Sequence, residues 1–292
     1  MTAKRDISRR SVMQEQWFVS EPRVIDVGVI RTLKVSLIGG QVDVIAHDEP
    51  ITRVEVHSVS GKDLKVSLDG DVLEIDHPQL RWDNFISVFA SFRDHARADV
   101  SILVPRSVQL KLGVVTAEAL VSGIRSDAKL NTVSGSVVVD QVQGDIDLNS
   151  VSGEFSVRNH RGEIEANTVS GDVTASGAID RFHANGVSGS VALDLSGTPL
   201  SVDNSTVSGD LTVRLPRAFR TYFTGNTVSG TLQLDGVQTR GVRGRGHSST
   251  SGPEGTPAVE IRANSVSGDI SVVRTSELAG ADFPAGGSGA PA

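Results

Sequence analysis

The side chains that could carry acid–base, nucleophilic or metal chemistry form no familiar catalytic spacing in this 292-residue sequence. A His-Glu-x-x-His run would predict a zinc hydrolase, and a Gly-x-Ser-x-Gly turn would predict a serine hydrolase. Neither run occurs, and the sequence also lacks a Walker loop and any cysteine for thiolate catalysis or zinc binding. The sequence therefore predicts a protein that is not an enzyme and that holds no cofactor and no metal.

The histidines and carboxylates are scattered along the chain. The histidines are His47, His57, His77, His95, His160, His183 and His247. We interpret His160 and His183, which fall inside the repeats described below, as solvated surface side chains. A carbohydrate-active β-helix enzyme is an alternative, and it needs a carboxylate cluster beside aromatic sugar platforms. The repeats contain one adjacent aromatic pair, Tyr222 and Phe223, which disfavours this alternative.

Hydroxyl side chains recur in pairs and could form a flat strip if the copies stack. The pairs are Thr132 and Ser134, Ser150 and Ser152, Thr168 and Ser170, Thr206 and Ser208, Thr227 and Ser229, and Ser265 and Ser267. Such a strip could bind an ordered ligand such as a glycan, a polymer or ice. The interpretation that we favour is structural, because Ser and Thr commonly satisfy backbone groups near turns.

These side chains belong to an internal repeat whose centre is the triplet Val-Ser-Gly. The triplet glycines are Gly61, Gly123, Gly135, Gly153, Gly171, Gly189, Gly209, Gly230 and Gly268. Asparagines precede most triplets at one position, namely Asn131, Asn149, Asn167, Asn185, Asn226 and Asn264. Asn204 is one residue out of register. A recurrent short unit of this kind is typical of repeat architectures.

Each unit divides into two halves in which apolar residues alternate with polar ones, and this alternation indicates β-strands. Val133, Gly135, Val137 and Val139 are expected on one inward face. Because a single strand and turn cannot bury its own apolar side, we expect successive copies to stack. Stacking predicts an Asn ladder at the positions given above. It also predicts a tight turn or a close backbone approach at Gly135, Gly153, Gly171 and Gly189.

The rest of the chain is less regular. Residues 15–107 also alternate and contain turn signals, which predicts a β-rich cap region with hairpin-like connections. Within it, aromatic side chains at helical spacing are expected to cover the end of the solenoid or, alternatively, to form an interface: Trp82, Phe85, Phe89 and Phe92. Residues 108–275 should form the solenoid repeats, with a mobile insertion at 236–258. Residues 1–14 and 276–292 should be a disordered N-terminus and a disordered tail.

Charge and composition exclude further classes. The formal net charge is −7, which disfavours a nucleic-acid partner because such surfaces are usually basic, despite three arginines in the insertion. No apolar run is long enough for a signal peptide or a membrane span. We therefore expect a cytoplasmic protein that reaches the cell envelope, if at all, through a partner.

The repeated segments NTVSGSV, NSVSGEF, NTVSGDV, STVSGDL and NSVSGDI resemble the bacterial putative-adhesin β-strand-repeat family, a domain of unknown function. The segment ADVSILVPRSVQLKL before the repeats is similar to that family's pattern, and the resemblance covers about residues 30–275. It implies a β-helix fold, a bacterial source and no catalytic residues. Some proteins related to this family are linked to envelope stress responses and antimicrobial-peptide sensing, so the resemblance also implies a link of this kind.

Fold and function are predicted together from these observations. The fold class is all-β, a single-stranded parallel β-helix (β-solenoid) with an irregular β-rich N-terminal cap. The predicted function is non-enzymatic binding or scaffolding for a protein or envelope component. The alternatives are a filament-forming structural β-helix protein and the carbohydrate-active enzyme considered above.

Overall fold

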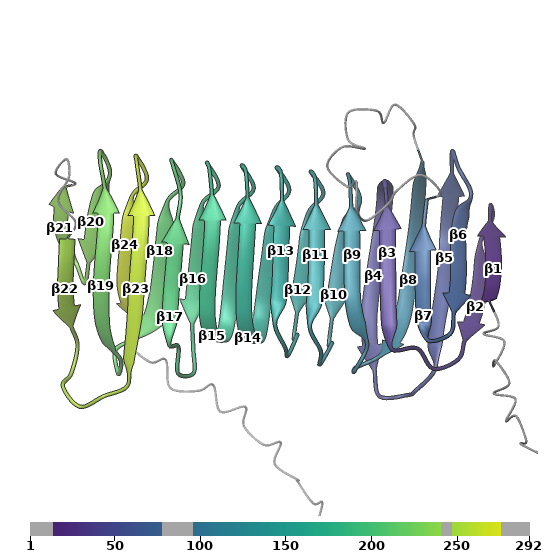
Figure 1. Ribbon diagram of the computed structural model, residues 1–292, viewed down its shortest axis with the longest axis horizontal. Coiled ribbons are helices and arrows are strands. Elements are labelled where there is room, and N and C mark those ends of the chain that lie inside the picture. The colour runs from purple at the N-terminus through teal and green to yellow at the C-terminus, as the bar shows by residue number, and fades with distance from the viewer. Residues whose placement is uncertain (1–13, 78–95, 241–246, 276–292) are drawn as a thin grey trace, which may run out of the picture.

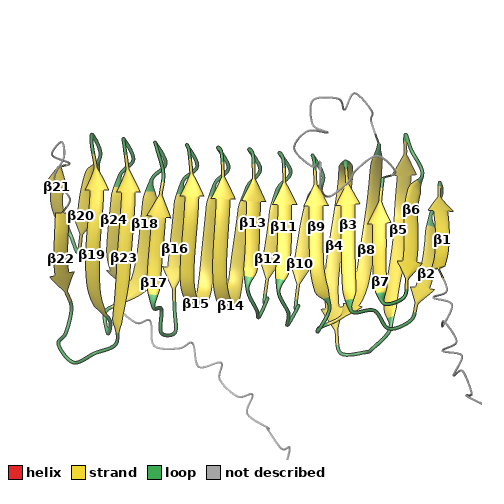
Figure 2. Cartoon of the chain, in the orientation of Figure 1, coloured by secondary structure: helices red, strands yellow, loops and turns green. Residues whose placement is uncertain are grey.

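The computed structural model describes residues 14–77, 96–240 and 247–275. Regular structure in these ranges consists of 24 β-strands that join into one sheet, and this sheet winds into an elongated stack (Figures 1 and 2). The predicted all-β solenoid is confirmed. Among the described residues, no helix is long and apolar enough to cross a membrane.

The regular middle of the stack advances by 18 residues per turn. Strand β11 (Ala128–Thr132) pairs in parallel with β13 (Ile146–Ser150), which places Leu130 beside Leu148. Between them, β12 (Val137–Asp140) runs on the other side of the stack and pairs with the first part of β14 (Phe155–Thr168). Each turn therefore has two strands and two corners, as the two half-repeats predict.

The strands form two columns that enclose the core. Four strands of the first column pair side by side in the order β9 (Gln109–Val114), β11, β13 and the second part of β14. The second column contains β10 (Glu118–Ser122), β12 and the first part of β14. Strand β15 (Val173–Gly186) crosses both columns, and β16 (Val191–Leu195), β17 (Ser201–Ser205) and β18 (Leu211–Pro216) continue them.

The core consists of apolar side chains at alternate strand positions. Leu130 and Leu148 from one column and Val139 and Val157 from the other are at most 1% exposed. Like side chains lie above one another from turn to turn, because each strand pairs with its copy in register. Complete burial of a side chain of this size contributes about 1.5–3 kcal/mol. The apolar alternation therefore stabilises the stack turn by turn.

The last repeat does not stack on the end of the solenoid. Strand β23 (Ala258–Ser265) lies between β17 and β19 (Arg220–Thr227), with parallel pairing on both sides. Strand β24 (Ile270–Thr275) likewise pairs with β18 and with β20 (Thr231–Leu234). Figure 1 shows this yellow turn between two green ones. The expectation that copies stack strictly in chain order is therefore wrong at this end.

Strands β21 (Val237–Arg240) and β22 (His247–Ser251) lie in the segment predicted to be a mobile insertion. They pair antiparallel with β20 and β19, and so form the outermost turn at the C-terminal end (Figure 1). The exposed backbone groups of β19 and β20 explain why parts of this segment form strands, because the edge of a sheet is a ready template for another strand.

At the N-terminal end, too, the spatial order of the strands differs from their order in the chain. Strands β3 (Thr32–Leu37) and β4 (Gly39–His47) form a turn that pairs with β9 and β10 on one side. On its other side lie β7 (Val72–Asp76) and β8 (Arg97–Pro105), again in parallel. The later strands β7 and β8 therefore separate the turn β3–β4 from the strands that follow it directly in the chain.

The outermost N-terminal strands are antiparallel. Strands β5 (Thr52–Ser60) and β6 (Leu64–Asp69) pair with β8 and β7, and β2 (Arg23–Val27) and β1 (Gln14–Val19) pair with β5 and β6. The described parts of residues 15–107 thus prolong the same two columns. The aromatic residues Trp82, Phe85, Phe89 and Phe92, like most of the two termini, lie outside the described residues.

Candidate functional site

The predicted asparagine positions are connected by side-chain hydrogen bonds from turn to turn. The Nδ2 of Asn149 donates to Oδ1 of Asn131 at 3.0 Å, and Asn167 donates to Asn149 at 3.4 Å. Asn185 donates to Asn167 at 3.3 Å. These side chains are half-buried or exposed at the end of one column, so each hydrogen bond replaces contacts with water and has a modest net value.

The asparagine row is interrupted once. Asn185 pairs with Ser205, whereas Asn204 lies beside Ala184 and is 4% exposed. Beyond Ser205 the row resumes, because Asn226 donates to Asn264 at 2.8 Å. The longer spacer before residue 209 therefore shifts Asn204 from the outer row into the core.

The triplet glycines bring neighbouring turns into close backbone contact. A Cβ on Gly153, Gly171 or Gly189 would collide with the carbonyl oxygen of the glycine one turn below, and a Cβ on Gly135 would collide with that of Ala117. None of these four glycines has a positive φ. Of the two roles predicted for them, the close approach is therefore the one that the geometry requires.

The hydroxyl pairs do not form the flat strip that the sequence offered as an alternative. The first member of most pairs is buried, and the hydroxyl of Thr168 donates to the carbonyl oxygen of Gly171 at 2.9 Å. The same hydroxyl accepts a hydrogen bond from the Gly171 amide at 2.8 Å. The second member is exposed, and Ser152 donates to the carbonyl oxygen of Val133 at 3.0 Å. The hydroxyls therefore satisfy backbone groups, as the structural interpretation proposes.

The valine of the triplet points outward in the later turns, which contradicts the inward position expected from alternation. We define the valine stripe as five such residues on successive turns, each 45–50% exposed: Val169, Val187, Val207, Val266 and Val228. Val133 is buried, but in a small cluster with Ile38, Ala96 and Val115 that is separate from the main core. The corner breaks the alternation, because it turns the chain between the two columns.

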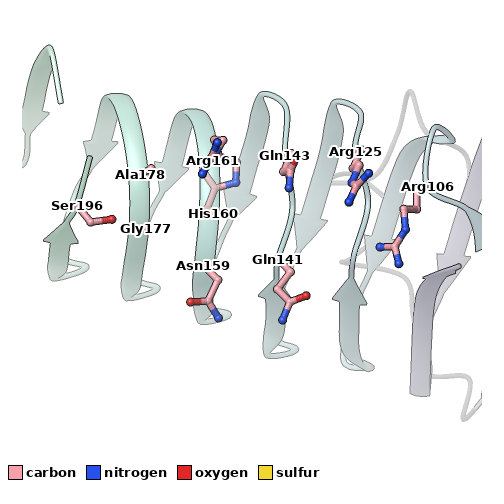
Figure 3. Close-up of a pocket in the computed structure, with 10 residues that line it drawn as sticks. All are labelled: Arg106, Arg125, Gln141, Gln143, Asn159, His160, Arg161, Gly177, Ala178 and Ser196. Carbon is pink, nitrogen blue, oxygen red and sulfur yellow. The ribbon is translucent and has the colours of Figure 1, made fainter. Parts of the chain in front are cut away.

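The corner opposite the valine stripe forms a polar groove (Figure 3). We define the arginine groove, a hollow of about 410 Å³, by Arg106, Arg125, Gln143, Arg161 and His160, which line it together with other corner residues. Backbone hydrogen bonds join successive turns at this corner. The Arg125 amide donates to the carbonyl oxygen of Arg106 at 2.7 Å, and the Arg161 amide donates to the carbonyl oxygen of Val142 at 3.0 Å. Three guanidinium groups therefore line one edge of the solenoid.

The backbone at this corner requires unusual conformations. Gln141 and Asn159 have φ values of 54° and 52°, in the left-handed region that few residues other than glycine adopt. The Asn159 side chain is held by a 2.9 Å hydrogen bond to Asp140. After each sharp turn the next side chain, Val142 or His160, is buried, and the one after it, Gln143 or Arg161, is exposed.

The three arginines of the groove differ in their hydrogen-bond and ion-pair partners. Arg106 donates from Nε to Asp48 at 2.6 Å and from Nη1 to the Gly123 carbonyl oxygen at 3.1 Å. This ion pair lowers the pKa of Asp48. Within the described parts of the chain, the guanidinium groups of Arg125 and Arg161 have no hydrogen bond or ion pair.

His160 was expected on the surface, but that interpretation is wrong. It is 1% exposed, and neither ring nitrogen has a hydrogen-bond partner within the described residues. Burial lowers the pKa of the imidazole, which keeps the ring neutral at pH 7. His160 follows Val142 by one repeat length, so a comparison of the repeats would have indicated a core position. His183, by contrast, is exposed.

Sequence reasoning also missed the arginine groove. Arg106, Arg125, Gln143 and Arg161 succeed one another at about one repeat length, and this spacing was the available signal. No group of three or more potential metal ligands occurs among the residues that the structure describes. What the groove presents to solvent is a row of guanidinium and amide donors.

Comparison with known proteins supports the architecture. Residues 106–198 match the model of the Toastrack DUF4097 family. No curated protein matches this sequence. A structure of a putative lipid binding protein from Parabacteroides distasonis is similar with a TM-score of 0.50 and 14% identity. That similarity covers 87% of this chain and 97% of the other, and it shows a shared fold.

Two further solved structures are similar at lower scores. A putative adhesin from Bacteroides fragilis has a TM-score of 0.48 and 9% identity over 91% of this chain and 98% of its own. A putative cell adhesion protein from Clostridium sporogenes has a TM-score of 0.31 and 13% identity over 87% of this chain and 100% of its own. The predicted resemblance to a putative-adhesin repeat family is confirmed by the match of residues 106–198 to the Toastrack DUF4097 model.

Proposed function

We propose that this protein is a non-enzymatic binding or scaffold protein that presents one edge of its solenoid to a protein or an envelope component. The observation that carries this proposal is the valine stripe, five apolar side chains that are each about half exposed on successive turns. Contiguous exposed apolar surface is uncommon on soluble proteins and often marks an interaction site.

The rigidity of the stripe favours binding. Backbone hydrogen bonds join Val169, Val187 and Val207 to neighbouring turns, with the Val207 amide donating to the Val187 carbonyl oxygen at 3.2 Å. Valine also has few side-chain rotamers to lose. A partner that buries the stripe therefore gains apolar contact at a small cost in conformational entropy.

Acidic residues close to the valine stripe indicate what kind of partner surface would fit it. The residue after the triplet glycine is acidic in several turns, namely Glu154, Asp172, Asp210 and Asp269. A partner surface with an apolar ridge beside basic residues would complement this edge. A role in envelope stress sensing, and a cytoplasmic location with envelope contact through a partner, are parts of this proposal that rest on sequence alone.

Paired charge substitutions test the proposal. Val187→Asp/Val207→Asp places two carboxylates in the stripe, and Thr174→Asp/Thr212→Asp places the same charge on the second column as a matched control. The purified variants would be used to recover envelope and cytosolic proteins, with mass spectrometry as the readout. We expect a reproducible partner of wild type and control to be lost at least tenfold with the stripe variant.

Two outcomes would contradict the proposal. Equal recovery of every partner by the stripe variant would show that the valine stripe is not the binding surface. Light scattering that reveals long end-to-end particles would instead support the filament-forming alternative. Circular dichroism and thermal unfolding of all variants would establish that the stripe variant keeps the wild-type fold.

A further inference from the structure

The arginine groove concentrates positive charge on a chain that is acidic as a whole. The complete sequence has 28 basic and 35 acidic residues, yet three arginines and no carboxylate line the groove. Gln141, Gln143 and Asn159 supply further amide groups along the same surface. The groove therefore offers many hydrogen-bond donors, while Asp48, which pairs with Arg106 and also interacts with Arg125, offsets part of the positive charge at one end.

The spacing of the donors follows from the stack. Arg106, Arg125, Gln143 and Arg161 occupy successive turns, and neighbouring strands in a sheet are about 4.8 Å apart. Guanidinium groups at such intervals can each bind an oxyanion through two parallel hydrogen bonds. Figure 3 shows these side chains projecting from consecutive turns along one edge.

Two of the three arginines are available to a ligand. The guanidinium group of Arg106 already donates hydrogen bonds to Asp48 and to the Gly123 carbonyl oxygen. Arg125 and Arg161 are exposed, and in the described ranges their guanidinium groups have no hydrogen-bond or ion-pair partner. Gln143 lies on the turn between them, where its side chain can donate to the same ligand but adds no charge.

We propose that the arginine groove binds phosphate groups, with Arg125 and Arg161 as the charged ligands and Gln143 as a neutral donor between them. The phosphates would belong to a linear polyphosphate-like anion or to lipid head groups, which share this chemistry. This site lies on the corner opposite the valine stripe, so it is independent of the proposed function. The ligand would run along the solenoid axis, because the donors do.

The test compares two double variants that remove the same charge. Arg125→Gln/Arg161→Gln gives both positions the residue that already occupies position 143, whereas Lys111→Gln/Arg214→Gln removes two exposed charges elsewhere. Binding of tripolyphosphate would be measured by titration calorimetry. Binding to vesicles of phosphatidylglycerol in phosphatidylcholine would be measured by sedimentation, with pure phosphatidylcholine as the neutral surface.

The expected result is at least a tenfold loss of affinity in the groove variant and less than a twofold change in the control. Gln143→Arg should increase affinity, because it completes the row. Binding of tripolyphosphate alone identifies a soluble anion as the source, and binding of anionic vesicles identifies lipid head groups. The proposal is overturned if wild type binds neither probe at 0.15 M salt, or if the control variant loses as much affinity as the groove variant.

Discussion

Single residues in this protein act mainly by permitting or completing the stack. Gly171 shows this most clearly, because its missing side chain allows the carbonyl oxygen of Gly153 to approach. The hydroxyl of Thr168 then bonds both the amide and the carbonyl oxygen of Gly171. The triplet and the residue before it are thus one structural unit.

Gly171→Ala should lower the free energy of unfolding by at least about 2 kcal/mol, because the new methyl group has no space without a shift of the backbone. Gly28→Ala is the matched control, since a Cβ there meets no atom within 4 Å. Denaturant unfolding of both variants measures the difference. Equal stability of the two would show that the turns are not in such close contact.

His77 should make stability depend on pH. Burial lowers its pKa to about 4 from the usual 6.5, and the Ile38 amide donates to its Nδ1 at 3.2 Å, which requires a neutral ring. Between pH 6.5 and 4 the unfolded chain binds a proton at His77 that the folded chain does not. The contribution of His77 is therefore complete above pH 6.5 and decreases by up to about 3 kcal/mol as the pH falls to 4.

The variant His77→Gln keeps a possible acceptor for Ile38 and should flatten this dependence. His183→Gln, at an exposed position, should leave it unchanged. The buried His160, whose pKa is also lowered, adds a dependence of the same sign, whereas burial raises the pKa of Asp76 and acts in the opposite direction. Identical pH profiles for wild type and His77→Gln, from unfolding curves at pH 4 to 7, would refute the assignment.

At the scale of strands, apolar alternation predicted the elements well. Positions such as Leu130 and Val139 could be assigned to the core because strands place every second residue on one face. The triplet valines could not, because a corner interrupts that period, and Val187 is 48% exposed. His160 and the arginine row could be found only by aligning one repeat against the next.

The order of the strands could not be predicted from the repeats. Parallel pairing of β17 with β23 joins residues 59 positions apart, for example Ser205 and Asn264. A copy of the repeat carries the same pairing groups wherever it stands in the chain, so the pattern alone does not identify its neighbours. The long spacer between Gly230 and Gly268 was the only indication of an altered path.

Ser205 marks the gap in the asparagine row, between Asn185 and Asn264. Ser205→Asn should complete the row and raise the free energy of unfolding by about 0.5–1 kcal/mol, the usual net value of a hydrogen bond. Ser201→Asn, on the same strand but outside the row, should not. Unfolding curves that show no gain for Ser205→Asn would indicate that the row adds nothing to stability.

The described part of the molecule is one stack with a different surface on each edge. The triplet corners form the valine stripe, and the opposite corners form the arginine groove. Antiparallel strands form the outermost turn at each end, while the parallel turns between them keep like residues in register (Figures 1 and 2). The two proposed binding surfaces therefore lie on separate edges of the stack.

The central claim is that repeat copies stack in register in the spatial order seen at the C-terminal end, and disulfide trapping tests it directly. The chain has no cysteine, so an introduced pair of cysteines can form a disulfide only with each other within one molecule. Under mild oxidation, Ser205→Cys/Asn264→Cys should form an intramolecular disulfide, because these residues are partners on adjacent strands, whereas Ser205→Cys/Asn226→Cys should not. Efficient cross-linking of positions 205 and 226 in place of 205 and 264 would contradict the fold described here.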